Sequence, residues 1–484
     1  MLSAGSAHGA QWETRAAVST GLVYTDNVCL TEDEKIDKWI LTATPSGTVK
    51  RTGGRSALDM RFSIGFNTLA ESGVNCPNNR QGQAGVSNVS PAPRLRLFSQ
   101  NRVAGDWLFF DAQAFAGQNL VNAFAPDSGD ELNATGNVNT TYGYSLSPYI
   151  RKRFGTRYEG LLRYSFDQRL NTTDAVRDST GERWLFDVGV PADRNKISYG
   201  ITGDYYEVEF EEFRNRPEVV TSISSYRLRG GYQLSRKLQF YASAGVDRND
   251  FLSTFEDIDD TAWDAGLVWT PNRRVTVQAG TGERFFGTTP KFSIEYRHRR
   301  SRLRFNYERE LTYTQNLRAN SQLPGVGFPN PPVDDPGLSG TPTTLSAQPI
   351  LNEGYVLFYR LGGKRNAIAI RAARSEQRRA ADGRDATFDN ASISWNFRFS
   401  ARTNFRAAVT YAEQDAEQFF LEDEDLVGPV RSSETLGYTL GFDRSFGSRS
   451  ELIVLYRYRD RESELEFDNF VENRVTLTWR YRFR

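Results

Sequence analysis

The sequence predicts an all-β fold, a transmembrane antiparallel β-barrel of about 22 strands that has no plug domain. Strand-like stretches of about 10–15 residues alternate apolar with polar side chains along the whole chain. Short and long connections follow one another in turn between these stretches. The sequence holds no run of about 18 apolar residues, so it offers no membrane-spanning helix. These features indicate a membrane protein whose hydrophobicity lies in alternating strands.

Each strand has one apolar and one polar face, as the last one shows. Val475, Leu477 and Trp479 share one side, and Thr478 and Arg480 share the other. A soluble β-sandwich would need apolar inner faces in both sheets, whereas a membrane barrel needs an apolar outside and a polar inside. We expect strands at residues 12–26, 36–50, 55–69, 93–103, 106–120, 140–153, 156–170, 182–192, 196–210, 221–234, 237–250, 261–271, 274–286, 289–299, 301–315, 352–363, 366–378, 386–399, 403–415, 432–446, 450–464 and 469–483.

The connections fall into two classes by length and charge. Short ones are often basic, such as "RFGTR" at 153–157 and "FGSRS" at 446–450. Long ones are polar and often acidic, such as "TDNVCLTEDEK" at 25–35 and "EEFRNRPE" at 211–218. Outer-membrane barrels have tight periplasmic turns and longer outside loops. The even strand number therefore places both termini in the periplasm, and the strands begin too early to leave room for an N-terminal plug. The connection at 286–290 is short for an outside loop.

Composition narrows the function classes. The net charge is zero, which gives no indication of a nucleic-acid partner. Aromatic residues make up 13% of the chain, a content suited to the aromatic girdles at the two membrane interfaces. Only eight of the 60 basic residues are Lys, which leaves 52 Arg. Near strand ends we assign to the girdles Phe154, Trp269, Phe285, Phe286, Phe446 and Phe483.

The N-terminal segment resembles the end of a secretory signal. Residues 1–10, "MLSAGSAHGA", are small and would permit cleavage before Gln11, although the basic and apolar parts of a signal are missing. The alternative is an ordinary terminus rich in Ala, Gly and Ser. We therefore divide the chain into a signal remnant at 1–10 and an outer-membrane barrel at 11–484.

Arginine on the polar face is the main candidate for a functional site. Guanidinium groups bind carboxylate and phosphate in a bidentate manner, so a lumen lined by them would favour anions. In the alternative interpretation, wall acids such as Asp167, Asp187, Glu295, Glu308 and Asp443 pair with these arginines and cancel their charge. By parity, the lumen-lining basic residues are Arg227, Arg229, Arg297, Arg299, Arg302, Arg304, Arg457, Arg459, Arg461, Arg480 and Arg482.

The two cysteines are predicted to form a disulfide. Cys29 and Cys76 fall in the first and second outside loops, which are neighbours on the rim in an oxidising compartment. Two unrelated thiols are the alternative. We predict no metal site, no cofactor and no enzyme, because the chain has only two histidines and His298 lies beside a periplasmic turn. Acidic loop residues such as Glu32 and Asp33 have oxygen ligands suited to Ca²⁺, although solvated loops are the simpler interpretation.

Two segments carry a family resemblance. The stretch "STGLVYTDNVCLTEDEKIDKWILTATPSGTVK" at 19–50, with its "YTDN" turn, and "GTGERFFG" at 280–287 resemble PEP-CTERM system-associated outer-membrane β-barrels. The resemblance implies a barrel associated with exopolysaccharide and matrix export loci, and it carries over no catalytic or binding residue. Barrel proteins commonly end on an aromatic residue, whereas here Phe483 is followed by Arg484.

We therefore expect a porin-like conduit in the bacterial outer membrane, associated with exopolysaccharide or extracellular-matrix export. The alternative is a non-conducting structural or docking barrel whose outside loops bind polymer or partner proteins. The expected partners are outer-membrane lipid and lipopolysaccharide, together with polysaccharide or periplasmic export components. A loop at 315–351 is long enough to fold into the lumen or to remain outside it.

Overall fold

A computed structural model of the chain describes residues 10–69, 74, 76, 91–120, 124–127, 132–135, 137–173, 176–192, 195–212, 217–255, 257–313, 347–416 and 431–483. The predicted signal remnant, apart from Ala10, and most of the 315–351 loop lie outside these ranges.

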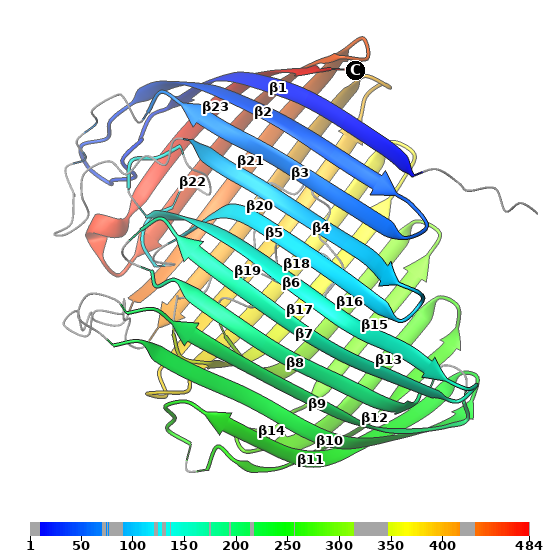
Figure 1. The fold of residues 1–484 in the computed structure, drawn as a ribbon. Helices are drawn as coiled ribbons and strands as arrows, with labels where there is room; N and C mark the ends of the chain where they lie inside the picture. Colours follow the sequence, from blue (N-terminus) through cyan, green and yellow to red (C-terminus); the bar gives the residue numbers. More distant parts are fainter. Residues whose placement is uncertain are drawn as a thin grey trace, which may run out of the picture.

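The wall is one antiparallel sheet that closes on itself (Figure 1). Each long strand pairs with the next one along the chain, and the last strand pairs with the first, which leaves no unpaired edge. The strands are β1 (Gln11–Thr25), β2 (Lys38–Thr52), β3 (Ser56–Asn67), β4 (Ala92–Ala104), β5 (Leu108–Leu120), β6 (Val138–Phe154), β7 (Tyr158–Asn171), β8 (Ser179–Val190), β9 (Ile197–Phe210), β10 (Val219–Ser235), β11 (Leu238–Asp250), β12 (Asp260–Asn272), β13 (Val275–Arg284), β14 (Gly287–Thr288), β15 (Lys291–His298), β16 (Ser301–Thr312), β17 (Ile350–Gly362), β18 (Asn366–Arg379), β19 (Asp385–Arg398), β20 (Thr403–Ala416), β21 (Arg431–Phe446), β22 (Ser450–Ser463) and β23 (Phe470–Arg482).

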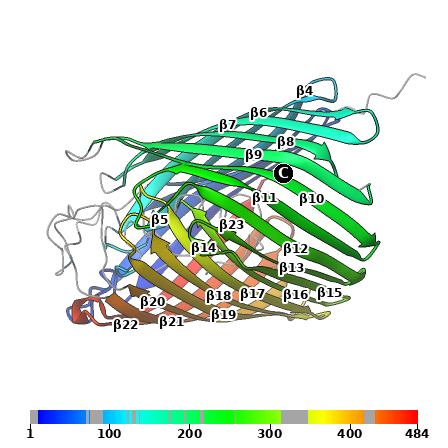
Figure 2. The ribbon, with the colours of Figure 1, turned by 90° about the horizontal axis from the view of Figure 1, so that it is seen from below.

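The prediction of about 22 antiparallel strands is confirmed. Of the 23 strands, β14 has two residues and folds back on the end of β13, while β13 itself pairs with β15. The short outside connection expected at 286–290 is this small hairpin. The absence of a plug domain stays a prediction. Viewed from below, the strands run obliquely around the wall (Figure 2).

The outer surface of the wall is apolar. Trp39 and Leu41 expose 63% and 58% of their surface, whereas Ile40 between them is fully buried. On β19, Ile393 and Trp395 are likewise exposed. Large apolar side chains at every second position form an apolar surface that is far too extensive for a water-soluble protein. This outer surface therefore contacts the hydrocarbon of a membrane. No helix in the described part of the chain has the length and apolar character needed to span a membrane.

The predicted girdle is correct for four aromatics and wrong for two. Phe154, Trp269, Phe446 and Phe483 are 44–53% exposed at strand ends. Phe286, in contrast, is 5% exposed, and Phe285 packs beside it. The chain turns inward at these residues to enter the β14 hairpin, which breaks the parity from which the prediction was made. Their rings contribute to a cluster that includes Phe251, Leu311, Leu351 and Ala380.

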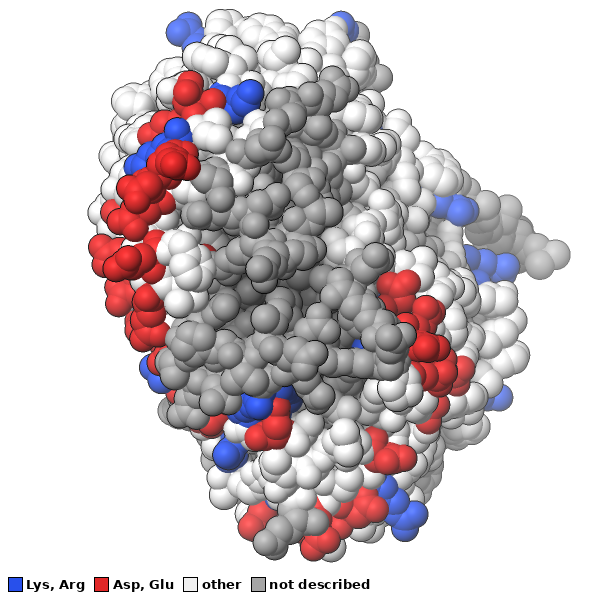
Figure 3. Space-filling model, turned by 90° about the vertical axis from the view of Figure 1, so that its left-hand side faces the viewer, with Lys and Arg blue, Asp and Glu red and all other residues white. Residues whose placement is uncertain are grey.

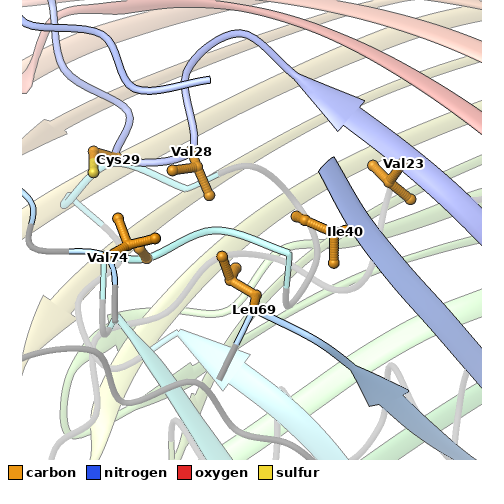
Figure 4. Packing of buried hydrophobic residues seen from close by; sticks show 7 residues of the cluster. Val23, Val28, Cys29, Ile40, Leu69 and Val74 are labelled. Carbon is orange, nitrogen blue, oxygen red and sulfur yellow. The ribbon is translucent and has the colours of Figure 1, made fainter. Parts of the chain in front are cut away.

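Buried apolar clusters lie at the end of the barrel that carries the long loops. One of them joins Val23 of β1 and Ile40 of β2 to loop residues Val28, Leu69 and Val74 (Figure 4). Because Val23 and Ile40 have inward parity, this cluster lies inside the wall rather than on its outer surface. The loops therefore extend the core of the protein into the outer mouth of the barrel.

Candidate functional site

The predicted lumen-lining arginines divide into groups with different partners. All of them except Arg299 lie on strands, at positions opposite in parity to the exposed apolar residues. Arg299 lies in the turn between β15 and β16 instead. The turn places it at the periplasmic rim, because the strand already ends at His298. Side chains beyond a strand end no longer alternate between the two faces. The alternation therefore assigned Arg299 to the lumen wall incorrectly.

A concentration of positive charge surrounds Glu295 on β15. The Glu295 Oε1 atom accepts hydrogen bonds from Arg297 Nε at 2.8 Å, Arg302 Nη2 at 2.8 Å and Arg304 Nη2 at 3.2 Å. One carboxylate thus faces three guanidinium groups. Arg360 of β17 is the Cα partner of Arg302, is exposed, and forms no ion pair with a described residue. The four arginines and one glutamate carry a net charge of three positive units, and we call them the arginine cluster.

Arg360 was not among the predicted site residues. The signal that could have found it is its parity within residues 352–363, where Val356, Phe358 and Arg360 share the inward face. A similar but smaller excess lies on β22 and β23, where Arg480 Nη1 and Arg482 Nη2 approach the Glu451 carboxylate at 3.5 and 2.5 Å.

On β10 the wall fits the alternative interpretation, in which acidic residues pair with the arginines and cancel their charge. Arg227 lies between Asp247, at 3.3 Å, and Asp264, at 3.4 Å, and Asp247 also accepts a hydrogen bond from Arg284 at 2.6 Å. Arg229 pairs with Asp187 of β8. The other acids considered from the sequence also have basic neighbours: Asp167 lies 4.0 Å from Arg169, Asp443 3.4 Å from Arg406 and Glu308 3.8 Å from Lys291. Positive charge is therefore neutralised along this part of the wall and left in excess on β15–β17.

The arginines of β22 bind a loop. Arg459 Nη1 donates to the carbonyl of Asp127 at 2.6 Å. Arg461 Nη2 donates to the carbonyl of Phe124 at 2.7 Å and to Ser433 Oγ at 3.0 Å. Phe124 and Asp127 belong to the connection between β5 and β6. Arg457 lies on the same face, with Thr439 and Arg474 as its Cα partners.

A second anchor of the same loop lies on β23. The Arg474 Nη2 atom donates to the carbonyl of Leu132 at 2.8 Å and to Glu472 Oε1 at 2.5 Å. Both side chains are almost fully buried, at 2% and 1% exposure. Thr25 of β1 also donates to Glu472 Oε1, at 2.7 Å. Neither Glu472 nor Arg474 was among the predicted site residues, although two opposite charges two positions apart on one inward face are a recognisable pattern.

These contacts carry the β5–β6 loop across the mouth of the barrel. Around the ring of strands, β5 is separated from β22 by β1–β4 and β23. The ring of Phe124 nevertheless packs against Phe388 of β19, with ring centroids 5.6 Å apart, and against Ala416 of β20. We call residues 124–127 and 132–135 the crossing loop. It places backbone and side chains inside the outer mouth.

The disulfide fixes the neighbouring loops. Cys29 and Cys76 are joined with Cα atoms 5.5 Å apart, the pairing predicted from their places in the first two outside loops. Ala134 of the crossing loop donates its backbone N–H to the carbonyl of Val28 at 2.9 Å, and Cys76 Sγ lies 3.8 Å from the carbonyl of Ala134. The described parts of the first three outside loops thus pack together.

On the opposite part of the rim, loop residues also pack against strand ends and against one another. Tyr313, just beyond β16, is fully buried against Val208 and Phe210 of β9, and its hydroxyl lies 2.9 Å from Thr221 Oγ1. Thr254, between β11 and β12, donates its N–H to the carbonyl of Ala380 at 2.8 Å. No group of three or more His, Cys, Asp or Glu residues suited to a metal ion occurs within the described ranges.

No protein-family model matches the sequence, and no curated protein gives a significant match. The fold is similar to that of the siderophore receptor PirA from Acinetobacter baumannii, with a TM-score of 0.51 and 10% identity over 97% of this chain and 80% of that one. It is also similar to the FrpB iron transporter (F5-1 variant) from Neisseria meningitidis, with a TM-score of 0.53 and 10% identity over 97% and 83%. At this identity the likeness concerns the barrel fold alone.

The closed wall, its apolar exterior and this fold all indicate that the barrel lies in a membrane. The chain is a bacterial outer-membrane β-barrel. Its two candidate functional elements are the arginine cluster on β15–β17 and the crossing loop in the outer mouth.

Proposed function

We propose that the barrel is a porin-like conduit for anionic solutes, with a passage narrowed at the outer mouth by the crossing loop. The observation that carries the proposal is the arginine cluster, in which Arg297, Arg302 and Arg304 share the single Glu295 carboxylate while Arg360, the Cα partner of Arg302, forms no ion pair with a described residue. Fixed cations on a lumen wall raise the local concentration of anions and lower that of cations.

Planar-bilayer recording of the refolded protein across a KCl gradient tests this proposal. An anion-selective conduit gives a reversal potential displaced toward the equilibrium potential of chloride. Displacement of the reversal potential toward the equilibrium potential of potassium would overturn the proposed anion selectivity. A closed lumen would give no conductance steps at all, and would overturn the conduit itself.

A second candidate is a non-conducting barrel that docks polymer or partner proteins through its outside loops. The packing of the outer mouth favours it, because apolar residues of several loops are buried together there. Bilayer recording also discriminates this candidate. A folded barrel, verified by its heat-modifiable migration in SDS gels, would then insert without producing current steps.

We further propose that the solute is an acidic polysaccharide or a small acid, and that the barrel serves exopolysaccharide or matrix export without catalysing a reaction. The resemblance at residues 19–50 and 280–287 supports this extension. Its partners would be lipopolysaccharide on the outside and export components in the periplasm. Radiolabelled-polymer efflux from vesicles containing the barrel tests it, with neutral dextran of the same size as the control.

A further inference from the structure

Aromatic side chains lie near both ends of the outer wall, and their charged neighbours differ in sign. At the periplasmic end, cationic side chains lie over outward-facing rings. The distances from cation to ring centroid are 5.3 Å for Arg51 over Trp12, 5.9 Å for Lys152 over Phe154, 5.5 Å for Lys196 over Tyr232 and 5.5 Å for Arg444 over Phe446. We call these four pairs the cationic belt.

The rings of the cationic belt are exposed on the lipid side, at 41–58% of their surface. None of its four cations forms an ion pair with a described residue. A ring at this position anchors at the membrane interface, and the cation that rests on it is held at the same depth. The belt therefore presents four unneutralised positive charges at headgroup level.

The outer end shows the reverse arrangement. Tyrosine hydroxyls on the outward face donate hydrogen bonds to carboxylates: Tyr355 to Glu353 at 2.8 Å, Tyr411 to Glu413 at 3.0 Å and Tyr458 to Asp460 at 2.9 Å. Seen end on, Asp and Glu gather along the edge of this end (Figure 3). Exposed acids at the adjoining strand ends and loops are Glu32, Asp33, Glu34, Asp37, Glu211, Glu212, Glu218, Asp250, Asp257, Asp259, Glu462, Glu464 and Glu466.

The periplasmic turns continue the positive charge of the belt. They carry exposed cations that form no ion pair with a described residue: Arg236, Lys237, Arg273, Arg274, Arg299, Arg300, Lys364 and Arg365. The charge difference between the two ends thus involves the whole perimeter rather than one patch.

We propose that the cationic belt binds the phosphate groups of anionic phospholipids in the periplasmic leaflet of the outer membrane. Two features favour lipid over a protein partner. The cations point out of the wall among exposed apolar residues, where hydrocarbon and headgroups meet. They are also distributed around the perimeter, on β2, β6, β21 and just before β9, so no compact partner could contact them together. The carboxylates at the opposite end offer phosphate no such cation, so the binding is expected at one end only.

Native mass spectrometry of the detergent-solubilised barrel tests this binding, with phosphatidylglycerol and phosphatidylcholine as separate probes. We expect phosphatidylglycerol to be retained at least tenfold better, since each interfacial Lys or Arg contributes about fivefold. A variant with Arg51→Gln, Lys152→Gln, Lys196→Gln and Arg444→Gln should lose most of this preference. The matched control is Glu413→Gln with Asp460→Asn at the opposite end, which should keep it.

Three outcomes would overturn the proposal: equal retention of the two lipids, an unchanged preference in the quadruple variant, or complete competition by inorganic phosphate, which would indicate a site for free anions. If the quadruple variant does not fold, the single variants Lys152→Gln and Lys196→Gln provide the same comparison. Each of these should lower phosphatidylglycerol retention by a factor of about two to five.

Discussion

The guanidinium of Arg474 and the carbonyl of Leu132 are joined by a hydrogen bond of 2.8 Å, although the two residues lie 342 positions apart in the chain. The bond connects the last strand of the wall to the crossing loop. Glu472 Oε1 accepts hydrogen bonds from Nε and Nη2 of the same guanidinium. A buried ion pair that also accepts and donates hydrogen bonds holds a loop in one position, because any displacement leaves a charge without a partner.

Replacing Arg474 with Met should therefore release the crossing loop. The variant leaves Glu472 buried and unpaired, which costs about 3–5 kcal/mol in the free energy of unfolding. Denaturant titration measures this loss, and bilayer recording should show larger or noisier current steps. The double variant Arg474→Met with Glu472→Gln removes both charges and should recover much of the stability. An equally unstable double variant would contradict the assigned cause.

Removing charge from the arginine cluster should shift the reversal potential toward the cation side. A unit charge about 10 Å from a permeating ion in water contributes about 0.4 kcal/mol, which is about a twofold change in the local concentration of that ion. Because the effect has opposite sign for anions and cations, Arg302→Gln combined with Arg360→Gln should lower the anion-to-cation permeability ratio about 16-fold. The effect should fade at high salt, because screening shortens the electrostatic range to about 3 Å at 1 M.

Arg227→Gln is the matched control for this experiment. Arg227 lies between Asp247 and Asp264, so its loss leaves local negative charge far from the arginine cluster. If the control shifted the potential as much as the cluster variant does, selectivity would not reside on β15–β17.

The Cys29–Cys76 disulfide should stabilise the outer mouth and not the wall. It closes a segment with a sequence separation of 47, and cross-links of this size contribute about 2–4 kcal/mol. In a Cys29→Ser, Cys76→Ser variant we expect faster protease cleavage within the first three outside loops, while the heat-modifiable migration of the barrel stays unchanged. Reduction of the native protein should give the same cleavage pattern. A loss of barrel migration would show that the disulfide acts on the wall.

The sequence allowed the wall to be predicted strand by strand because a period of two is a local signal. It allowed the faces to be assigned wherever alternation is unbroken, as at Ile393 and Trp395. Phe285 and Phe286 were misassigned because a turn interrupts the alternation.

The contact between Arg474 and Leu132 could not be foreseen, since no local pattern encodes which strand a loop will reach across the mouth. The distribution of charge along the wall also could not be predicted from the sequence. It depends on strand register, which brings three arginines to Glu295 but two aspartates to Arg227.

Two adjacent positions on β19 test the assignment of the two faces directly. Ile393 is 54% exposed on the apolar outer face, whereas Ser394 points inward and has the small residues Ala369 and Ala408 as its Cα partners. Arginine at a lipid-facing position near the bilayer midplane costs about 2–4 kcal/mol. Ile393→Arg should therefore lower the free energy of unfolding in lipid vesicles by about that amount, while Ser394→Arg should change it by less than ~1 kcal/mol because its side chain enters water. If Ser394→Arg lowered the free energy of unfolding more than Ile393→Arg, the arginines of the wall would face lipid. The proposed conduit would then have no cationic wall.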